Sequence, residues 1–470
     1  MSQQGDSIRI LLSAPQDGEA FVDAMMALAA QSRESEATRH ALAEILPHLL
    51  KVIENFDQTS QDLMGATLRC IGNACVENPE ACNQVIPSGS ELSWPAILLN
   101  ERGTGIRDLA IKVLYNLCSQ SEDVQKRCYE ASLHGSIISA LHKQAKSAQG
   151  TKDDPFGGLS FPIDLIFWIT SQRPKEGDAM SKDQADGTDD EQLRLRQLVE
   201  LPSLLAGDLD IDDFATLLEV VLVFLRSSKN QAYVAEGKLT EAVWDIMNHN
   251  EDKLREADIA ADDQKLLVAL STSLTWVLSD IADSDAFKKS EDAEGTFMGR
   301  VLPLTTPDAN VSSCFSSDLD NGAIRLLSAA YQVIGNFLHN VDPQFAVSLV
   351  RDRRIHERVF AIMVTTDNAD LLHSAAGLLI QLSRPSPEIR ETISLDSKAT
   401  PAIESLGRHS IQQLNQDALM LMRALGKDTP AVQERFKPLA GEVMATVAKA
   451  QQAAAASDAQ EGQPTLVGTN

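Results

Sequence analysis

The sequence predicts an all-α protein, an α-solenoid superhelix of the armadillo/HEAT type, and three observations lead to this fold class. An apolar helix, a polar break and a shorter amphipathic helix recur along the chain. Hydrophobic residues make up 43% of the chain but aromatic residues only 5%, which favours an aliphatic, helical core. Alternating strand patterns between β-turn signals are absent, so we expect almost no β-structure.

The repeated unit is clearest in ATLRCIGNACVENPEACNQVI, which starts at Ala66, and in LAIKVLYNLCSQSEDVQKRC, which starts at Leu109. Weaker copies follow to the C-terminal part of the chain. The shorter spacings between copies, 43 and 45 residues, fit the armadillo/HEAT period, and the longer ones, 52 and 56 residues, indicate loop insertions. Alignment places eight residues at one equivalent position: Ala74, Leu117, Ile169, Leu225, Ile281, Phe337, Leu382 and Leu425.

The same alignment predicts the organisation of the chain. Residues 1–16 form an N-terminal segment and residues 17–440 the solenoid. Within the solenoid we expect an acidic, flexible loop at about 173–191 and an insertion at about 290–320 that packs against the repeats. Residues 441–470 are expected to be a frayed helix followed by a disordered tail.

Charge and cysteine usage limit the partners and the compartment. The 67 acidic and 41 basic residues give a net charge of −26, which disfavours nucleic acid and favours a basic protein partner. Solubility alone is the competing explanation of this acidity. The six cysteines show no C-x-x-C spacing, and neither a secretory signal nor a membrane span is recognisable. We therefore expect a reduced, cytoplasmic protein that does not insert into membranes.

Motifs for chemistry are missing from the sequence. We find no nucleotide-binding glycine loop, no nucleophile elbow and no His/Cys cluster with metal spacing. The acidic run GDLDIDDF, residues 207–214, lacks the glycine and the distant glutamate of a calcium loop. We interpret it as a helix start, with Asp212 and Asp213 favouring the N-terminal dipole. We expect a binding protein without catalytic residues, metal or cofactor.

Amides at equivalent positions of the apolar helices suggest a binding surface. These groove amides are Asn73, Asn116 and Gln381, together with Asn336. An amide donates and accepts hydrogen bonds, so a row of amides could hold the main chain of a partner. The alternative is that each amide ties its helix to the loop of the next repeat. Asn340 follows Asn336 by one helical turn, which makes a polar pair where a scaffold needs one group.

This part of the sequence resembles a known family. Asn336, Phe337, Asn340 and Asp342 match an N-F-x-x-N-x-D pattern of the armadillo-repeat small-GTPase guanine nucleotide dissociation stimulators (SmgGDS). The stretch HSAAGLLIQLSRPSPEI, residues 373–389, is similar to the next repeat of that family. RCIGNACVENPE, residues 69–80, is similar to an early repeat. The likeness is spread over most of the chain, and the asparagine pair is its specific motif.

The resemblance implies a partner and a role. In that family the solenoid binds Rho- and Ras-type GTPases through their switch regions, loosens the nucleotide site, and accommodates a polybasic, prenylated C-terminus. It thus implies GTPase contacts at Asn336, Asn340 and Asp342. We expect Asp280, Asp283 and Asp285 to contact the basic tail of the GTPase. The alternative is that they are exposed carboxylates at helix ends without such a role. We expect a monomer, because capped solenoids are commonly monomeric.

A plain scaffold or adaptor without exchange activity is the second hypothesis, because it needs only a concave surface. An acidic stripe along the inner helices would favour the GTPase-binding protein. Acidity confined to loops and convex faces would favour the scaffold.

Overall fold

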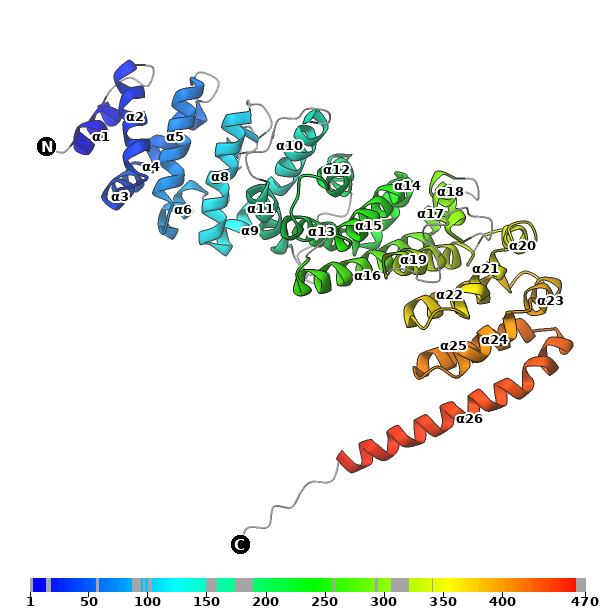
Figure 1. Ribbon diagram of the computed structural model, residues 1–470. Coiled ribbons are helices and arrows are strands. Elements are labelled where there is room, and N and C mark those ends of the chain that lie inside the picture. Colours follow the sequence, from blue (N-terminus) through cyan, green and yellow to red (C-terminus); the bar gives the residue numbers. More distant parts are fainter. Residues whose placement is uncertain are drawn as a thin grey trace, which may run out of the picture. The chain divides into compact units, whose positions relative to one another are not determined.

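The computed structural model describes residues 3–13, 18–55, 59–86, 94–95, 98–99, 104–148, 159–173, 189–256, 259–291, 295–305, 321–339 and 341–461. The regular elements in these ranges are helices, and the described residues contain no β-strand. Two compact units divide the chain, residues 1–224 and 225–470. Each unit is a stack of helical repeats (Figure 1), so the predicted all-α solenoid class is confirmed.

Unit 1 is built on four inner helices that pack one on the next in chain order: α2, α5, α8 and α11. Most of the remaining helices pack against these four. The helices of this unit are α1 (Gln3–Ser13), α2 (Glu19–Gln31), α3 (Glu36–Glu44), α4 (Leu46–Glu54), α5 (Gln61–Ala74), α6 (Pro79–Val85), α8 (Thr104–Gln120), α9 (Glu122–Glu130), α10 (Leu133–Ala148), α11 (Ser160–Ser171) and α12 (Asp189–Leu205), followed by α13 (Ile211–Leu225) at the division between the units.

Unit 2 repeats the plan with the inner helices α16, α19, α22 and α25, which again pack consecutively. Its helices are α14 (Ser228–Glu236), α15 (Thr240–Leu254), α16 (Ala261–Asp283), α17 (Asp285–Ser290), α18 (Thr296–Val301), the 3-10 turn η2 (Leu302–Thr305), α19 (Asn321–Phe337), α20 (Pro343–Arg351), α21 (Ile355–Met363), α22 (Ala369–Leu382), α23 (Pro387–Leu395), α24 (Ala399–Gly407), α25 (Gln412–Gly426) and α26 (Pro430–Glu461).

The predicted repeat register is confirmed by burial. All eight aligned residues lie in the last turns of helices, and each is at most 3% exposed. The layers nevertheless hold three helices where the sequence suggested two. After α20, the chain turns at Arg354, whose backbone is left-handed with φ 52°, and forms the third helix α21. Ser132 and Lys238 take the same left-handed conformation just before α10 and α15.

The second helix of three layers starts with the same capping arrangement. Asn78, Asp342 and Ser386 each cap a helix whose first residue is a proline. The cap side chain accepts a backbone N–H that has no partner inside the helix, and proline has no N–H to leave unsatisfied there. This arrangement explains why the polar breaks recur so regularly in the sequence.

Glycine allows two inner helices of unit 1 to approach closely. A Cβ atom on Gly72 of α5 would lie 3.2 Å from Cγ2 of Val113 on α8. This is tighter than ordinary van der Waals contact, so only glycine fits there without a shift of Val113.

The segments set apart by the sequence are described in part. Residues 174–188 of the expected acidic loop lie outside the described residues, and α12 begins at Asp189. In the expected insertion, α18 and η2 pack with buried Phe297, Met298 and Leu302, whereas residues 306–320 lie outside the described part. At the C-terminus α26 continues to Glu461, and residues 462–470 are not among those described.

One described helix, α16, is long and apolar enough to cross a membrane. Its most apolar window is 56% buried within the protein, and it packs between α15 and α19. A core helix of a repeat stack meets the same length and hydropathy criteria, so this feature is weak evidence for a membrane span.

Candidate functional site

A groove of about 540 Å³ runs across the inner helices α16, α19 and α22 of unit 2. Most of its lining residues are uncharged and polar, with hydroxyl side chains from all three helices and amide side chains from α19 and α22. Asn336 and Gln381, two of the amides singled out in the sequence, both line it. We call this surface the unit-2 groove.

Asn336 connects two walls of the unit-2 groove. Its Nδ2 donates hydrogen bonds to the main-chain oxygen and to Oγ of Ser279 on α16, at 3.0 and 2.7 Å. Asn73 makes the equivalent bond in unit 1, where Nδ2 donates to Oγ of Ser32 at the end of α2, at 2.8 Å. The amides thus bind their helix to the preceding repeat, whereas the alternative in the sequence analysis named the next one. In Asn336 the Oδ1 acceptor is not used in these two bonds.

Other polar groups of the groove differ in whether they are satisfied. Gln332 donates from Nε2 to Oγ of Ser374 at 3.0 Å, and Ser374 donates to the main-chain oxygen of Asp370 at 2.7 Å. Ser328 Oγ and Gln381 Oε1 are buried and have no hydrogen-bond partner. Because an unsatisfied buried polar atom is costly, these two atoms mark places where an added ligand group would be stabilised.

An exposed aromatic side chain stands at the groove. Trp276 of α16 is 66% exposed and belongs to the lining. Large aromatic side chains are seldom left so exposed, and tryptophan is enriched in binding surfaces. The indole N–H adds a hydrogen-bond donor beside an apolar face.

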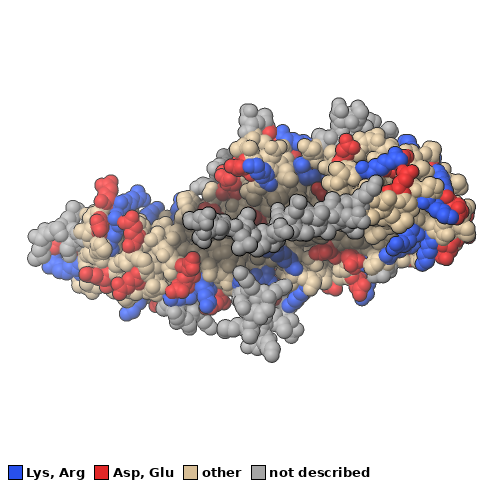
Figure 2. All heavy atoms as spheres, turned by 90° about the horizontal axis from the view of Figure 1, so that it is seen from below, with Lys and Arg blue, Asp and Glu red and all other residues tan. Residues whose placement is uncertain are grey.

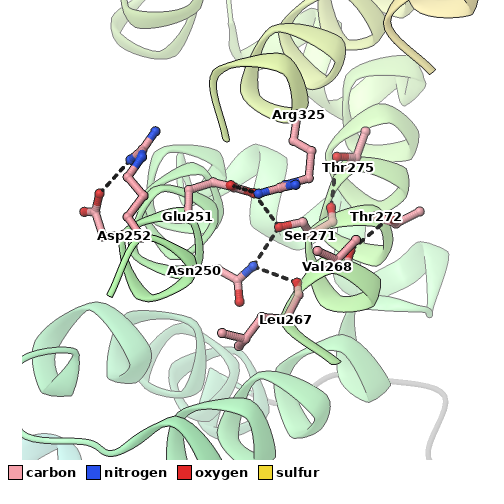
Figure 3. A network of polar contacts seen from close by, with 10 residues as sticks. Asn250, Glu251, Asp252, Leu267, Val268, Ser271, Thr272, Thr275 and Arg325 are labelled. Atoms are coloured by element: carbon pink, nitrogen blue, oxygen red, sulfur yellow. Dashed lines mark hydrogen bonds and ion pairs between the residues drawn. The ribbon is translucent and has the colours of Figure 1, made fainter. Parts of the chain in front are cut away.

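Below the groove lies a buried ionic network (Figure 3). Glu251 of α15 has no solvent exposure, and its two oxygens accept from Nε and Nη2 of Arg325 at 2.8 and 2.6 Å. Ser271 donates to Oε1 of Glu251 at 2.6 Å and accepts from Nδ2 of Asn250 at 2.7 Å. Arg325 and Ser271 also line the groove. The network fixes the Arg325 guanidinium with Nη1 outside the bidentate pair.

A second buried carboxylate holds a histidine at the groove. His373 Nδ1 lies 2.7 Å from Oδ2 of Asp417 on α25, a residue only 1% exposed. Hydrogen bonding to Asp417 raises the pKa of His373 above its ordinary value, although partial burial opposes this. The bond to Asp417 orients the His373 imidazole at the groove.

The residues expected to contact a GTPase have different positions. Asn336 lies in the groove, Asn340 lies outside the described residues, and Asp342 caps α20 by accepting from the N–H of Gln344 at 2.9 Å. Asn116 of α8 is half-buried and lies beside Gly72 of α5.

The carboxylates expected to contact a basic tail lie at the end of α16 and the start of α17, outside the groove lining. Asp280 and Asp285 are exposed there. Asp283 is paired with Lys288 Nζ at 3.1 Å and lies 3.4 Å from Nδ1 of His339. Its charge is therefore partly neutralised within the protein.

The lining of the unit-2 groove does not form the acidic stripe that would favour the GTPase-binding protein over the scaffold. Within the groove lining Asp370 is the one carboxylate, and the charge of Arg325 is paired with the buried Glu251. On the face drawn in Figure 2, basic and acidic side chains are interspersed over the coloured residues.

Sequence reasoning missed most of the groove. It found the amides from their repeat position, but Glu251, Arg325, His373 and Asp417 carry no local motif. Trp276 lies on α16 without a motif that marks it as a surface residue. The fold and this groove together define an all-α helical-repeat solenoid protein with a groove in unit 2 that is lined by hydroxyl and amide side chains.

No protein-family model matches the chain, and no curated protein matches it. Among solved structures, the crystal structure of an engineered protein is similar to this chain with a TM-score of 0.38 and 17% sequence identity. The similarity covers 90% of this chain and 99% of the engineered one.

Proposed function

We propose that the unit-2 groove binds a partner protein, and that this partner is a small GTPase of the Rho/Ras type with a basic, prenylated C-terminal tail. The protein would act in the cytoplasm as a non-classical guanine nucleotide exchange factor and chaperone. The observation that carries the proposal is the position of Asn336, the specific residue of the family resemblance, in the wall of the groove.

The chemistry of the groove supports a polypeptide ligand. Its volume, about 540 Å³, is in the range typical of ligand sites. Hydroxyls and amides can donate to and accept from a main chain, and Gln381 Oε1 and Ser328 Oγ lack partners inside the protein. Trp276 offers an exposed apolar face to a partner side chain.

Exchange by such a surface would be mechanical. Binding energy gained in the groove would stabilise a GTPase conformation with an opened nucleotide site. The solenoid itself would contribute no proton transfer and no covalent step. Asp280 and Asp285, exposed at the end of α16, are the candidate contacts for the basic tail.

The test is a binding measurement with a purified Rho-type GTPase, with and without its basic tail. Asn336→Ala is compared with Asn73→Ala, because both variants remove hydrogen bonds between neighbouring repeats, two to Ser279 and one to Ser32. We expect a loss of stability in both variants and at least tenfold weaker GTPase binding in Asn336→Ala alone. Gln381→Leu should also weaken binding, without removing a bond between repeats.

Two results would overturn the proposal. Equal GTPase binding by Asn336→Ala and Asn73→Ala would assign Asn336 to the fold alone. Absence of binding by the wild-type protein at low salt would reject the GTPase as partner.

An adaptor without exchange activity is the second candidate function. The near-neutral lining of the groove, with Asp370 as its one described carboxylate, favours it. A nucleotide-release assay separates the two functions. An exchange factor accelerates release of bound GDP from the GTPase, whereas an adaptor leaves the rate unchanged.

A further inference from the structure

Three metal-ligating side chains converge in unit 2 away from the groove. His356 and Glu357 lie in the first turn of α21, and Asp396 caps the C-terminus of α23. One ligand atom from each residue lies within 4.8 Å of the other two. The cluster joins the third helix of one layer to the second helix of the next.

The histidine is buried and incompletely satisfied. His356 is only 4% exposed, and its Nδ1 has no hydrogen-bond partner. Burial lowers the pKa of His356 below its ordinary value, against the opposing effect of Glu357 and Asp396. The free Nδ1 of this buried imidazole is available as a ligand atom, and neutral imidazole is the form that binds a metal ion.

The two carboxylates are positioned for a shared ligand. Asp396 Oδ1 accepts from the N–H of Lys398 at 2.7 Å, which orients the carboxylate and leaves its second oxygen outside this bond. Glu357 Oε1 pairs with Nε of Arg354 at 2.5 Å. The Arg354 side chain is 64% exposed, so this ion pair costs little to break.

The spacing suits coordination better than hydrogen bonding. No described hydrogen bond joins the imidazole of His356 to Glu357 or Asp396, although their ligand atoms lie within 4.8 Å. In a tetrahedral zinc site with bonds of about 2.0–2.2 Å, ligand atoms are about 3.3–3.5 Å apart. Side-chain adjustments of about 1 Å would bring the three atoms to that geometry.

We propose that His356, Glu357 and Asp396 bind one divalent transition-metal ion, Zn²⁺, with water in the fourth position. One imidazole nitrogen and two carboxylate oxygens form a ligand set used by zinc, and the two carboxylates neutralise the ion. The ion would tie α21 to α23. The sequence analysis expected no metal, because Asp396 is distant along the chain and only folding brings it to the histidine.

The test uses the full chain after chelator treatment, titrated calorimetrically with ZnCl₂. We expect one Zn²⁺ per chain and a rise in melting temperature. His356→Gln and Asp396→Asn should each weaken binding at least about tenfold and remove the rise in melting temperature. Glu391→Gln, an exposed position on α23, and His409→Gln are the matched controls and should bind as the wild type.

Cobalt identifies the ligands directly. Co²⁺ bound at the proposed site gives visible d–d absorption that His356→Gln and Asp396→Asn abolish. A sulfur-to-cobalt charge-transfer band would place the ion at cysteine thiols and overturn the proposal. Absence of binding, or binding unchanged in both variants, would overturn it as well. If His356→Gln fails to fold, Asp396→Asn decides the result alone.

Discussion

Nη2 of Arg325 lies 2.6 Å from Oε2 of Glu251, a carboxylate without solvent exposure. The two residues are 74 positions apart in the chain and belong to different helices, α19 and α15. This buried pair supports one side of the unit-2 groove. Its removal tests the groove independently of any partner.

Glu251→Ala should destabilise unit 2 by about 3 kcal/mol, because the change leaves Arg325 unpaired in a largely buried position. This loss of stability is at the lower end for breaking a buried ion pair, because the Arg325 side chain is 23% exposed. Asp252→Ala is the control. Its partner Arg255 is exposed, so we expect a loss of no more than about 1 kcal/mol. Urea denaturation measures both, and equal losses would contradict a buried pair.

The pair of His373 and Asp417 should make stability depend on pH. The folded-state pKa of His373 is raised above 6.5, so folding stabilises the protonated form. The contribution is fully present below pH 6.5 and is lost as the pH rises through the folded pKa. Because His373 is half-exposed, the effect should be small.

NMR titration of the His373 imidazole checks this prediction. Asp417→Asn should lower the pKa of His373, because it removes the acceptor charge. The difference in melting temperature between wild type and His373→Gln should shrink as the pH is raised. An imidazole that titrates identically in wild type and Asp417→Asn would show that the bond does not form in solution.

Two glycines of inner helices should respond differently to alanine. Gly377 of α22 has no neighbouring atom within 4 Å of an added Cβ, so Gly377→Ala should stabilise the protein by about 0.5–1 kcal/mol through helix propensity. For Gly72→Ala the same gain is opposed by the 3.2 Å contact with Val113. Thermal denaturation should therefore rank Gly377→Ala above Gly72→Ala.

The five described cysteines should be protected from thiol reagents in the folded protein. All five are buried, and burial raises the pKa of Cys70 to about 12. The pKa of Cys118 is raised by its hydrogen bond with Cys128 and by its burial. Because the thiolate is the reactive form, thiol reagents at pH 8 should modify these cysteines only after the protein unfolds. A Cys314→Ser background confines the assay to these five, and rapid modification without denaturant would contradict their burial.

The repeat architecture could be predicted because short stretches of sequence encode each repeat. Buried residues recur at one position of each inner helix, and the Asn78, Asp342 and Ser386 caps before prolines mark the breaks. The third helices were missed. In α10, α15 and α21 the start depends on a left-handed backbone at Ser132, Lys238 and Arg354, none of which is a glycine.

The sequence by itself determined the helical class, the register of the inner helices and the amides Asn336 and Gln381 as groove positions. These depend on side-chain periodicity within one repeat, which neighbouring residues specify. The tertiary structure decided that Asn336 bonds to Ser279, that Glu251 holds Arg325 and that Asp417 holds His373. Such pairs form only when stacking brings distant helices together, because a buried charge or amide takes its partner from whatever side chain packs against it.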